Sequence, residues 1–150
     1  MASLKLASAA MALLLLFSSA ASGQGGQLFL NVYVDDTPGK ALVVGNVDDI
    51  TGLSFLNTSD KIYEDNGQIY AVCDSLVEKD DDGWRLSFPA SGYYNEYHAV
   101  FLVSGGFAFR EINCTEGLEL LSTAHNGSIV LDVQGFDLTD PAVNFSYAAS

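Results

Sequence analysis

Two Asn-Gly dipeptides, Asn66-Gly67 and Asn126-Gly127, constrain the fold of this chain more than any other local feature. Asn-Gly is the strongest short signal for a two-residue β-hairpin turn, because both residues readily adopt the positive φ angles that the turn requires. Short runs rich in Val, Ile, Leu and Tyr flank both dipeptides, at residues 61–64 and 68–75 and at residues 118–124 and 128–133. The sequence therefore predicts one antiparallel hairpin around each dipeptide.

The rest of the chain repeats this pattern, and no stretch after residue 23 has a helical period of useful length. Turn-forming residues occur at 35–39 (DDTPG), 80–83 (DDDG), 104–106 (SGG) and 140–141 (DP). The remaining predicted strands are residues 28–34, 41–47, 84–88, 96–103, 107–112 and 142–147. Nine or ten short strands at this spacing predict an all-β fold, an antiparallel two-sheet sandwich of Ig-like architecture, with an incomplete barrel as the alternative.

The first 23 residues have the layout of a secretory signal peptide. Lys5 supplies a positive charge, residues 9–17 (AAMALLLLF) are apolar, and residues 18–23 (SSAASG) offer the small side chains that a signal peptidase needs. An uncleaved anchor helix is the alternative, but such an anchor usually needs about 20 apolar residues. We therefore expect a signal-peptide helix over residues 1–23 and a single β-domain over residues 24–150. The mature protein is then secreted or on the cell surface, with no membrane span.

The chain is strongly acidic, with 19 acidic against 6 basic residues and a formal net charge of −13. A field of this sign repels nucleic acid and anionic lipid head groups, so neither is an expected partner. Hydrophobic residues make up 49% of the chain, which is too many for a disordered acidic tail. One domain of this length can therefore build its own core without a metal.

Cys73 and Cys114 are the only cysteines of the chain. In an oxidising compartment, two cysteines in a small domain predict a disulfide first. Closing the loop between them would stabilise the fold by roughly 4 kcal/mol on the chain-entropy model. A buried unpaired thiol at Cys73 and a cross-link to another chain are the two alternatives.

Four asparagines fit the N-glycosylation pattern Asn-x-Ser/Thr, namely Asn57, Asn113, Asn126 and Asn144. Chance predicts roughly one such site among the asparagines of a chain with this content of Ser and Thr, so four indicate a secreted, glycan-bearing surface. Asn126 also belongs to a predicted hairpin turn, which explains its Asn-Gly-Ser sequence without a glycan. Asn144 lies in a predicted strand and can carry a glycan only if its side chain points outward.

Aspartates cluster at residues 35–36 and 48–49, and at Asp80, Asp81 and Asp82. Oxygen-rich loops can hold Ca²⁺, and the last cluster is the candidate calcium site. None of the clusters has the alternating spacing of a dedicated calcium loop. The alternative is that these aspartates satisfy backbone donors in turns. No cofactor is expected.

Two tyrosine-rich segments, residues 92–97 (GYYNEY) and 145–147 (FSY), are candidates for an aromatic platform that binds sugar. Tyrosines that pack across strands are the alternative. The histidines are His98 and His125, and the sequence has no nucleophile elbow, no zinc-type histidine spacing and no glycine-rich phosphate loop. We therefore expect no catalytic residues and a protein that is not an enzyme.

Three features together resemble secreted envelope proteins of methanogenic archaea. They are the acidic balance, the dense glycosylation sites, and a short β-domain that ends near residues 135–137 (GFD) and 140–141 (DP). The resemblance extends across residues 27–147 and includes residues 84–88 (WRLSF) and 97–101 (YHAVF). It implies a place in a surface layer or sheath whose β-rich subunits associate side by side, and it implies no catalytic residues.

The sequence thus predicts a secreted, N-glycosylated structural protein of the cell envelope, whose partners are further copies of itself or other envelope proteins. A sheath subunit needs a strand edge that is free to pair with a neighbour. Residues 28–34 and 142–147 lack charges until their ends and are the candidate edges, unless both strands are interior. The alternative function is an extracellular module that binds carbohydrate or Ca²⁺.

Overall fold

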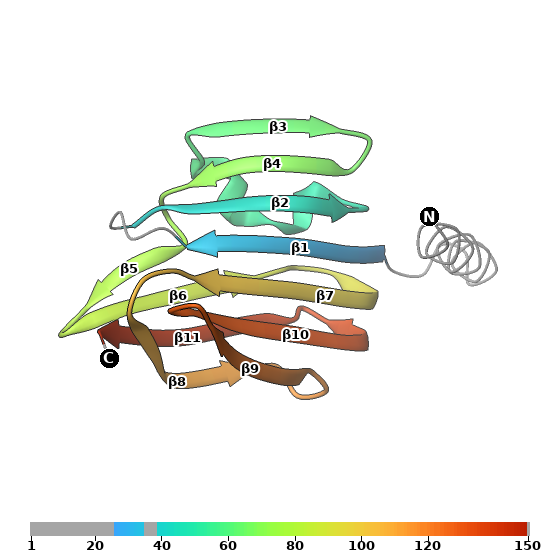
Figure 1. The fold of residues 1–150 in the computed structure, drawn as a ribbon. Helices are drawn as coiled ribbons and strands as arrows, with labels where there is room; N and C mark the ends of the chain where they lie inside the picture. Colours follow the sequence, from blue (N-terminus) through green and yellow to red (C-terminus); the bar gives the residue numbers. More distant parts are fainter. Residues whose placement is uncertain (1–25, 35–38, 150) are drawn as a thin grey trace, which may run out of the picture.

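The computed structural model describes residues 26–34 and 39–149, which form two β-sheets packed face to face (Figure 1). A sheet of seven strands, here called the large sheet, has the order β3-β4-β2-β1-β7-β10-β9. The small sheet has four strands in the order β5-β6-β11-β8 and lies behind the large sheet in the view of Figure 1. The prediction of an all-β sandwich with two sheets is therefore confirmed.

The strands of the large sheet are β1 (Gly26–Val34), β2 (Ala41–Val47), β3 (Lys61–Asp65), β4 (Gln68–Cys73), β7 (Tyr93–Val103), β9 (Glu119–His125) and β10 (Ser128–Thr139). Those of the small sheet are β5 (Val77–Asp80), β6 (Gly83–Pro89), β8 (Phe107–Cys114) and β11 (Ala142–Ala149). Two short 3-10 helices, η1 (Ile50–Gly52) and η2 (Ser54–Thr58), connect β2 to β3. All ten strands named from the sequence are present. The pattern missed β5, because three of its four residues are charged.

The two Asn-Gly turns form as predicted. Asn66 and Gly67 have φ angles of 50° and 81° and join β3 to β4 in an antiparallel hairpin. Asn126 and Gly127 have φ angles of 51° and 79° and join β9 to β10 in the same way. Positive φ at both central residues matches the right-handed twist of the strands, so the two dipeptides fix the register of these hairpins.

The large sheet is not antiparallel throughout, which corrects the sequence prediction. β1 pairs antiparallel with β2 on one side but in parallel with β7 on the other, from Gln27↔Glu96 to Val34↔Val103. Between β1 and β7 the chain passes through the small sheet as β5 and β6, and a crossover of this length can return parallel to its first strand. The Ig-like part of the prediction is not confirmed, because immunoglobulin domains divide seven or nine strands between their sheets.

The core lies between the inner faces of the two sheets. On β1 the residues Leu28, Leu30, Val32 and Val34 are all buried, and the residues between them point away from the core. Ring contacts connect the sheets, with Phe88 of β6 packed edge-on against Phe101 of β7 at 5.3 Å between ring centroids. Where the small sheet does not cover β4, the helix η2 does (Figure 1), and it buries Phe55 and Leu56.

The predicted signal peptide, residues 1–23, lies outside the described residues. Within residues 26–34 and 39–149, no helix has the length and the apolar character that crossing a bilayer requires.

The hydroxyl group of Tyr97 is buried in this core. Tyr97 on β7 is 1% exposed, and its hydroxyl has no hydrogen-bond partner among the described residues. Burial raises the pKa of Tyr97 well above its ordinary value. By contrast, the hydroxyl of Tyr94 donates a hydrogen bond of 3.1 Å to the carbonyl oxygen of Ser91. Replacing tyrosine by phenylalanine therefore removes an unpaired hydroxyl group at Tyr97 and a hydrogen bond at Tyr94.

We expect Tyr97→Phe to keep or raise the free energy of unfolding, by up to about 1 kcal/mol, because the change removes a buried hydroxyl that makes no hydrogen bond. The matched variant Tyr94→Phe should lower it by about 1 kcal/mol. Thermal unfolding at neutral pH measures both. A Tyr97→Phe variant that loses more stability than Tyr94→Phe would show that the Tyr97 hydroxyl is bonded in solution.

Candidate interaction surface

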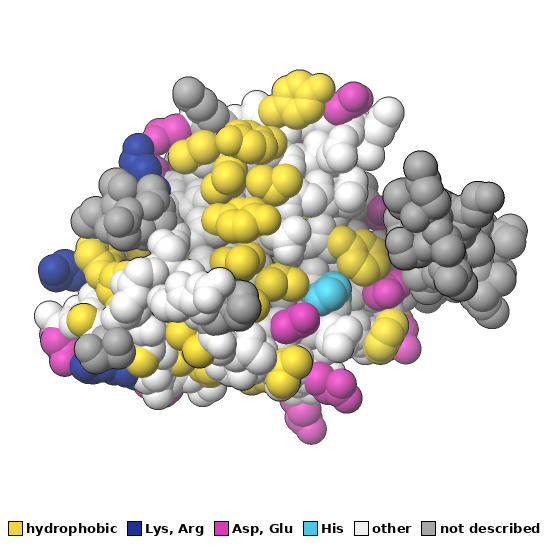
Figure 2. All heavy atoms as spheres, in the orientation of Figure 1, with side chains coloured by type: hydrophobic (Ala, Val, Ile, Leu, Met, Phe, Trp, Pro, Cys, Tyr) yellow, Lys and Arg dark blue, Asp and Glu magenta, His cyan; other side chains and the backbone are white. Residues whose placement is uncertain are grey.

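Apolar side chains cross the outer face of the large sheet in a continuous row. Tyr33 of β1 pairs in register with Leu42 of β2 on one side and with Leu102 of β7 on the other. Leu42 in turn pairs with Val72 of β4, and Leu102 with Val130 of β10. These five residues, here called the apolar row, span five neighbouring strands. Figure 2 shows hydrophobic side chains gathered in a band that crosses the strands of this face.

A second register row lies two residues along the strands and is here called the tyrosine row. It contains Tyr63 of β3, Tyr70 of β4, Val44, Asn31, Val100, Asp132 and Leu121. Tyr63 is 64% exposed, Tyr70 is 49% exposed, and Tyr33 of the apolar row is 43% exposed. Three tyrosines therefore present their rings to solvent on one face of the molecule.

A groove runs along part of this face beside the apolar row. Its volume is about 510 Å³, and its lining includes Tyr33, Leu42, Tyr70, Val72 and Leu102, with Lys40 at one end. The lining is largely apolar, and besides the tyrosines its polar residues are Lys40, Ser104 and Ser128. Concave apolar surfaces with a few polar groups are the usual form of binding sites.

A histidine and an aspartate meet at the border of the apolar band. His98 of β7 and Asp132 of β10 are 34 positions apart in the sequence, and Nε2 of His98 lies 2.8 Å from Oδ1 of Asp132. The imidazole ring also packs edge-on against Phe29 of β1, at 6.4 Å between ring centroids. This pair could not be predicted from the sequence, because the diagonal contact depends on the register between β7 and β10.

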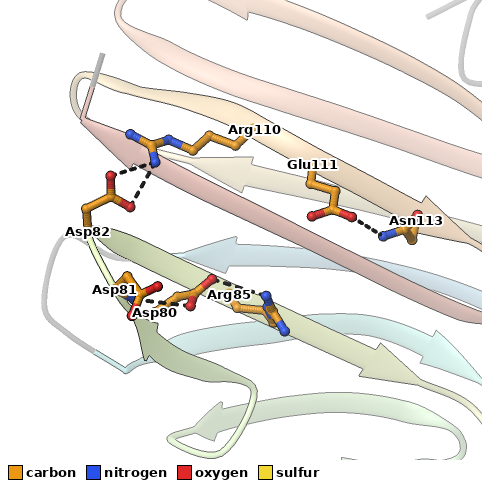
Figure 3. Close-up of polar contacts among 7 residues, drawn as sticks. All are labelled: Asp80, Asp81, Asp82, Arg85, Arg110, Glu111 and Asn113. Atoms are coloured by element: carbon orange, nitrogen blue, oxygen red, sulfur yellow. Dashed lines mark hydrogen bonds and ion pairs between the residues drawn. The ribbon is translucent and has the colours of Figure 1, made fainter.

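The outer face of the small sheet has the opposite character. A shallow groove of about 190 Å³ there is lined by Arg85, Ser87, Glu111, Asn113, Asn144 and Ser146, together with Phe145. Two of these residues, Asn113 and Asn144, belong to predicted glycosylation sites and are direct neighbours in the pairing of β8 with β11. Figure 3 shows Asn113 donating a hydrogen bond of 3.2 Å to the carboxylate of Glu111.

Three of the four predicted glycosylation sites lie away from the apolar band, and the fourth, at Asn126, lies next to it, because Ser128 of that site lines the groove. Asn57 is exposed on η2, which packs on the inner side of the large sheet, and Asn126 is exposed in the β9–β10 turn. Asn113 and Asn144 lie on the outer face of the small sheet, where Asn144 is half-buried. Asn144 therefore points outward, as a glycan requires. Glycosylation itself stays a prediction.

The three aspartates proposed for Ca²⁺ do not point toward a common centre (Figure 3). Asp80 forms an ion pair of 3.2 Å with Arg85, and Asp82 forms one of 2.7 Å with Arg110. The hydrogen bond and the charge of Arg110 lower the pKa of Asp82. Asp80 also accepts a hydrogen bond from the backbone of Asp81. Among the described residues, no three acidic, histidine or cysteine side chains gather as metal ligands would.

The tyrosine-rich segments named from the sequence do not form an exposed platform, which agrees with the packing alternative. Tyr94 and Tyr97 are buried and pack edge-on against each other, at 6.2 Å between ring centroids. Tyr147 of residues 145–147 is buried as well, and Tyr93 donates a hydrogen bond of 2.6 Å to Asp137. The tyrosines that face solvent in the apolar row and the tyrosine row lie outside these segments and are Tyr33, Tyr63 and Tyr70. In the sequence, the signal of Tyr33 and Tyr70 was the alternation of side chains along residues 28–34 and 68–73. Alternation alone does not show which side of a strand is the outer one.

Cys73 and Cys114 are free thiols in the structure, so the expected disulfide between them is not formed. Cys73 is buried on the inner face of β4, where it accepts a hydrogen bond of 3.1 Å from the hydroxyl of Ser59, and burial raises the pKa of its thiol. Cys114 ends β8, which packs against β10. β10 is four strand positions from β4, about 19 Å away. A disulfide needs Cα atoms within about 7 Å.

The strands named as candidate edges are both interior, which is the alternative that the sequence left open. β1 lies between β2 and β7, and β11 lies between β6 and β8. Among the described strands, the edges are β3 and β9 in the large sheet and β5 and β8 in the small sheet. β3, β5 and β8 each carry at least two charged residues, whereas β9 carries the single carboxylate of Glu119. Charged side chains normally protect an edge from pairing with another chain.

We expect Cys114→Ala to lower the free energy of unfolding by no more than about 1 kcal/mol, because a half-buried free thiol contributes little. Cys73→Ala should cost more, since it leaves a cavity in the core. The double variant should show the sum of the two effects, as distant and unconnected sites do. Denaturant unfolding without reductant measures all three. Single variants that each lose roughly 4 kcal/mol, with no further loss in the double variant, would show a disulfide instead.

The two outer faces are thus an apolar band on the large sheet and a polar groove on the small sheet. No protein-family model matches the chain, and neither a curated protein nor a solved structure matches it.

Proposed function

We propose that this chain is a secreted, N-glycosylated, non-catalytic structural protein of the cell envelope, and that it binds its partner through the outer face of the large sheet. The observation that carries the proposal is the apolar row of Val72, Leu42, Tyr33, Leu102 and Val130 on the outside of the fold. We infer a partner from this surface and a place in the envelope from the sequence.

The central strands of the large sheet are apolar on both sides. On β1, Val32 points into the core while Tyr33 points outward, and on β7 Phe101 and Leu102 alternate in the same way. An antiparallel sheet with one face in water normally alternates apolar and polar residues. Strands that are apolar on both faces are typical of a sheet covered on both sides. Contiguous apolar patches of several hundred Å² usually mark interaction sites.

Export is supported by the leader-like residues 1–23 and by the four glycosylation sites. Their arrangement is favourable for a surface protein, because glycans on Asn113 and Asn144 would cover the polar small sheet and leave the large sheet accessible. The resemblance to archaeal envelope proteins supports a layer or sheath in particular. Side-by-side association of such subunits needs an open edge, and the sparsely charged β9 is the edge of the large sheet that suits it.

We expect Leu102→Glu to reduce the fraction of the protein that co-sediments with isolated cell envelopes at least tenfold, because the new carboxylate lies in the middle of the apolar row. The matched control is Ser87→Glu, which introduces the same charge on the outer face of the small sheet, leaves every predicted glycosylation site intact and should sediment as the unmodified protein does. Circular dichroism confirms that both variants fold. Unchanged sedimentation of Leu102→Glu would refute this surface as the envelope contact.

A carbohydrate-binding module is the second candidate, favoured by the three exposed tyrosines of the large sheet. Tyr63 and Tyr70 face each other across β3 and β4, and Tyr33 lies two strands beyond Tyr70 on the same side. Tyrosine rings combine a flat apolar face with a polar hydroxyl group, which suits a sugar ring.

If this candidate is right, an array of envelope and extracellular polysaccharides contains a ligand, and Tyr70→Ala weakens its binding at least tenfold in a calorimetric titration. Tyr93→Ala is the control, since Tyr93 is an exposed tyrosine held by Asp137 outside the tyrosine row. Binding that is unaffected by Tyr70→Ala, or an array without any ligand, would eliminate the second candidate.

A further inference from the structure

We propose that the partner of the large sheet is a second copy of this chain, packed face to face about a two-fold axis. This inference rests on the proposed function and names the occupant of its surface. Three observations carry it: the residue order of the apolar row, the distribution of charge, and the positions of the glycosylation sites.

The apolar row reads the same in both directions. From β4 to β10 its residues are Val72, Leu42, Tyr33, Leu102 and Val130, which is Val-Leu-Tyr-Leu-Val. A two-fold interface brings the same patch of both subunits together, so the patch must complement itself. An axis along β1 places Tyr33 opposite the partner's Tyr33. It places Leu42 opposite the partner's Leu102, and Val72 opposite the partner's Val130.

Charge permits contact between like chains at this face. The chain has a net charge of −13, which opposes self-association wherever carboxylates meet. Among the described side chains of the apolar row and the tyrosine row, Asp132 is the single carboxylate, and it is bonded to His98. A cationic partner would be drawn to the acidic remainder of the surface instead. The face therefore selects a partner by shape and apolar area, which a second copy offers.

The size of the band fits a weak dimer. Five strands at about 4.8 Å spacing and the two rows with their margins cover about 500 Å² on each chain. Two such faces bury about 1,000 Å² in total, at the lower limit for a specific interface. Stacked sheets lie about 10 Å apart with interdigitated side chains, as in a sandwich core. We therefore expect a dimer that dissociates on dilution through the micromolar range.

Three of the four predicted glycosylation sites lie off the proposed dimer face, whereas Asn126 lies next to Ser128 of the groove. The dimer therefore requires Asn126 without a glycan, and its place in a hairpin turn explains the Asn-Gly-Ser sequence without one. The asparagines on the outer face of the large sheet are Asn31 and Asn46, and neither begins a glycosylation site. Asn113 and Asn144 lie on the small sheet, which becomes the outermost layer on both sides of the dimer. The assembly then has four layers in the order small, large, large and small, with sugar on the outside and apolar side chains in the middle.

Sedimentation equilibrium of the purified, secreted protein over a concentration series tests the dimer. The unmodified protein should fit a monomer–dimer equilibrium. Leu102→Glu and Leu42→Lys should each raise the dissociation constant at least tenfold, while the control Ser87→Glu should leave it unchanged. Circular dichroism again confirms folding. A protein that stays monomeric at the highest concentration overturns the inference, and so does a dimer that Leu102→Glu leaves intact.

The relative orientation has its own test, because Leu42 is expected to face the partner's Leu102. The double variant Leu42→Lys with Leu102→Glu should recover the dimer, since each lysine then meets a carboxylate of the partner. Leu42→Glu with Leu102→Glu should stay monomeric. Recovery of neither double variant, or of both, overturns the two-fold arrangement.

The envelope assay separates this inference from the proposed function. If the unmodified protein is monomeric but Leu102→Glu still loses envelope binding, the face binds a different molecule, so the dimer fails and the function stands. If Leu102→Glu abolishes the dimer but not envelope binding, the dimer stands and the proposed function of this face fails.

Discussion

The pairing of β1 with its two neighbours is the constraint on which the rest of the large sheet depends. β1 joins the part of the sheet formed by β3, β4 and β2 to the part formed by β7, β10 and β9. Because side chains alternate between faces, a slip of one residue would expose Val32 and bury Tyr33. The same register that fills the core therefore aligns the apolar row on the outside, and neither can change without the other.

This dependence explains how one molecule has two unlike faces. β11 and β6 present Asn144, Ser146, Ser87 and Arg85 outward, so this part of the small sheet alternates between a buried side and a hydrated one. The central strands of the large sheet do not alternate in this way, because they carry apolar side chains on both faces. The free-energy cost of leaving those side chains in water is removed only when another surface covers them. Area alone does not set an affinity, because association also costs freedom of motion. The modest size of the band is consistent with contacts that add up in an array.

The sequence predicted the features that depend on local chemistry. Asn66-Gly67 and Asn126-Gly127 determine their turns by their own backbone preferences, so both hairpins were predicted correctly. β5 was missed because its charged residues resemble a loop. The parallel pairing of β1 with β7 was missed because it joins residues about 70 positions apart, and no local signal specifies it.

The candidate site was less predictable for the same reason. The alternation in residues 28–34 shows that Val32 and Tyr33 point to opposite sides, but not which side faces the core. The apolar row joins Leu42 to Val130 through three intermediate pairings, and no single strand contains that information. Residues 92–97 looked more aromatic than any of these strands, yet Tyr94 and Tyr97 fill the interior. Local richness in one residue type does not distinguish a surface from a core.

The place of Asn144 on an interior strand has a consequence for the order of events during biogenesis. The backbone around Asn144 is paired with β6 on one side and with β8 on the other. A glycosyltransferase must hold the acceptor segment in its own active site, which it cannot do while both ladders are closed. A sugar on Asn144 would thus record a chain that met the transferase before it folded, and a bare Asn144 beside an occupied Asn57 would record the reverse.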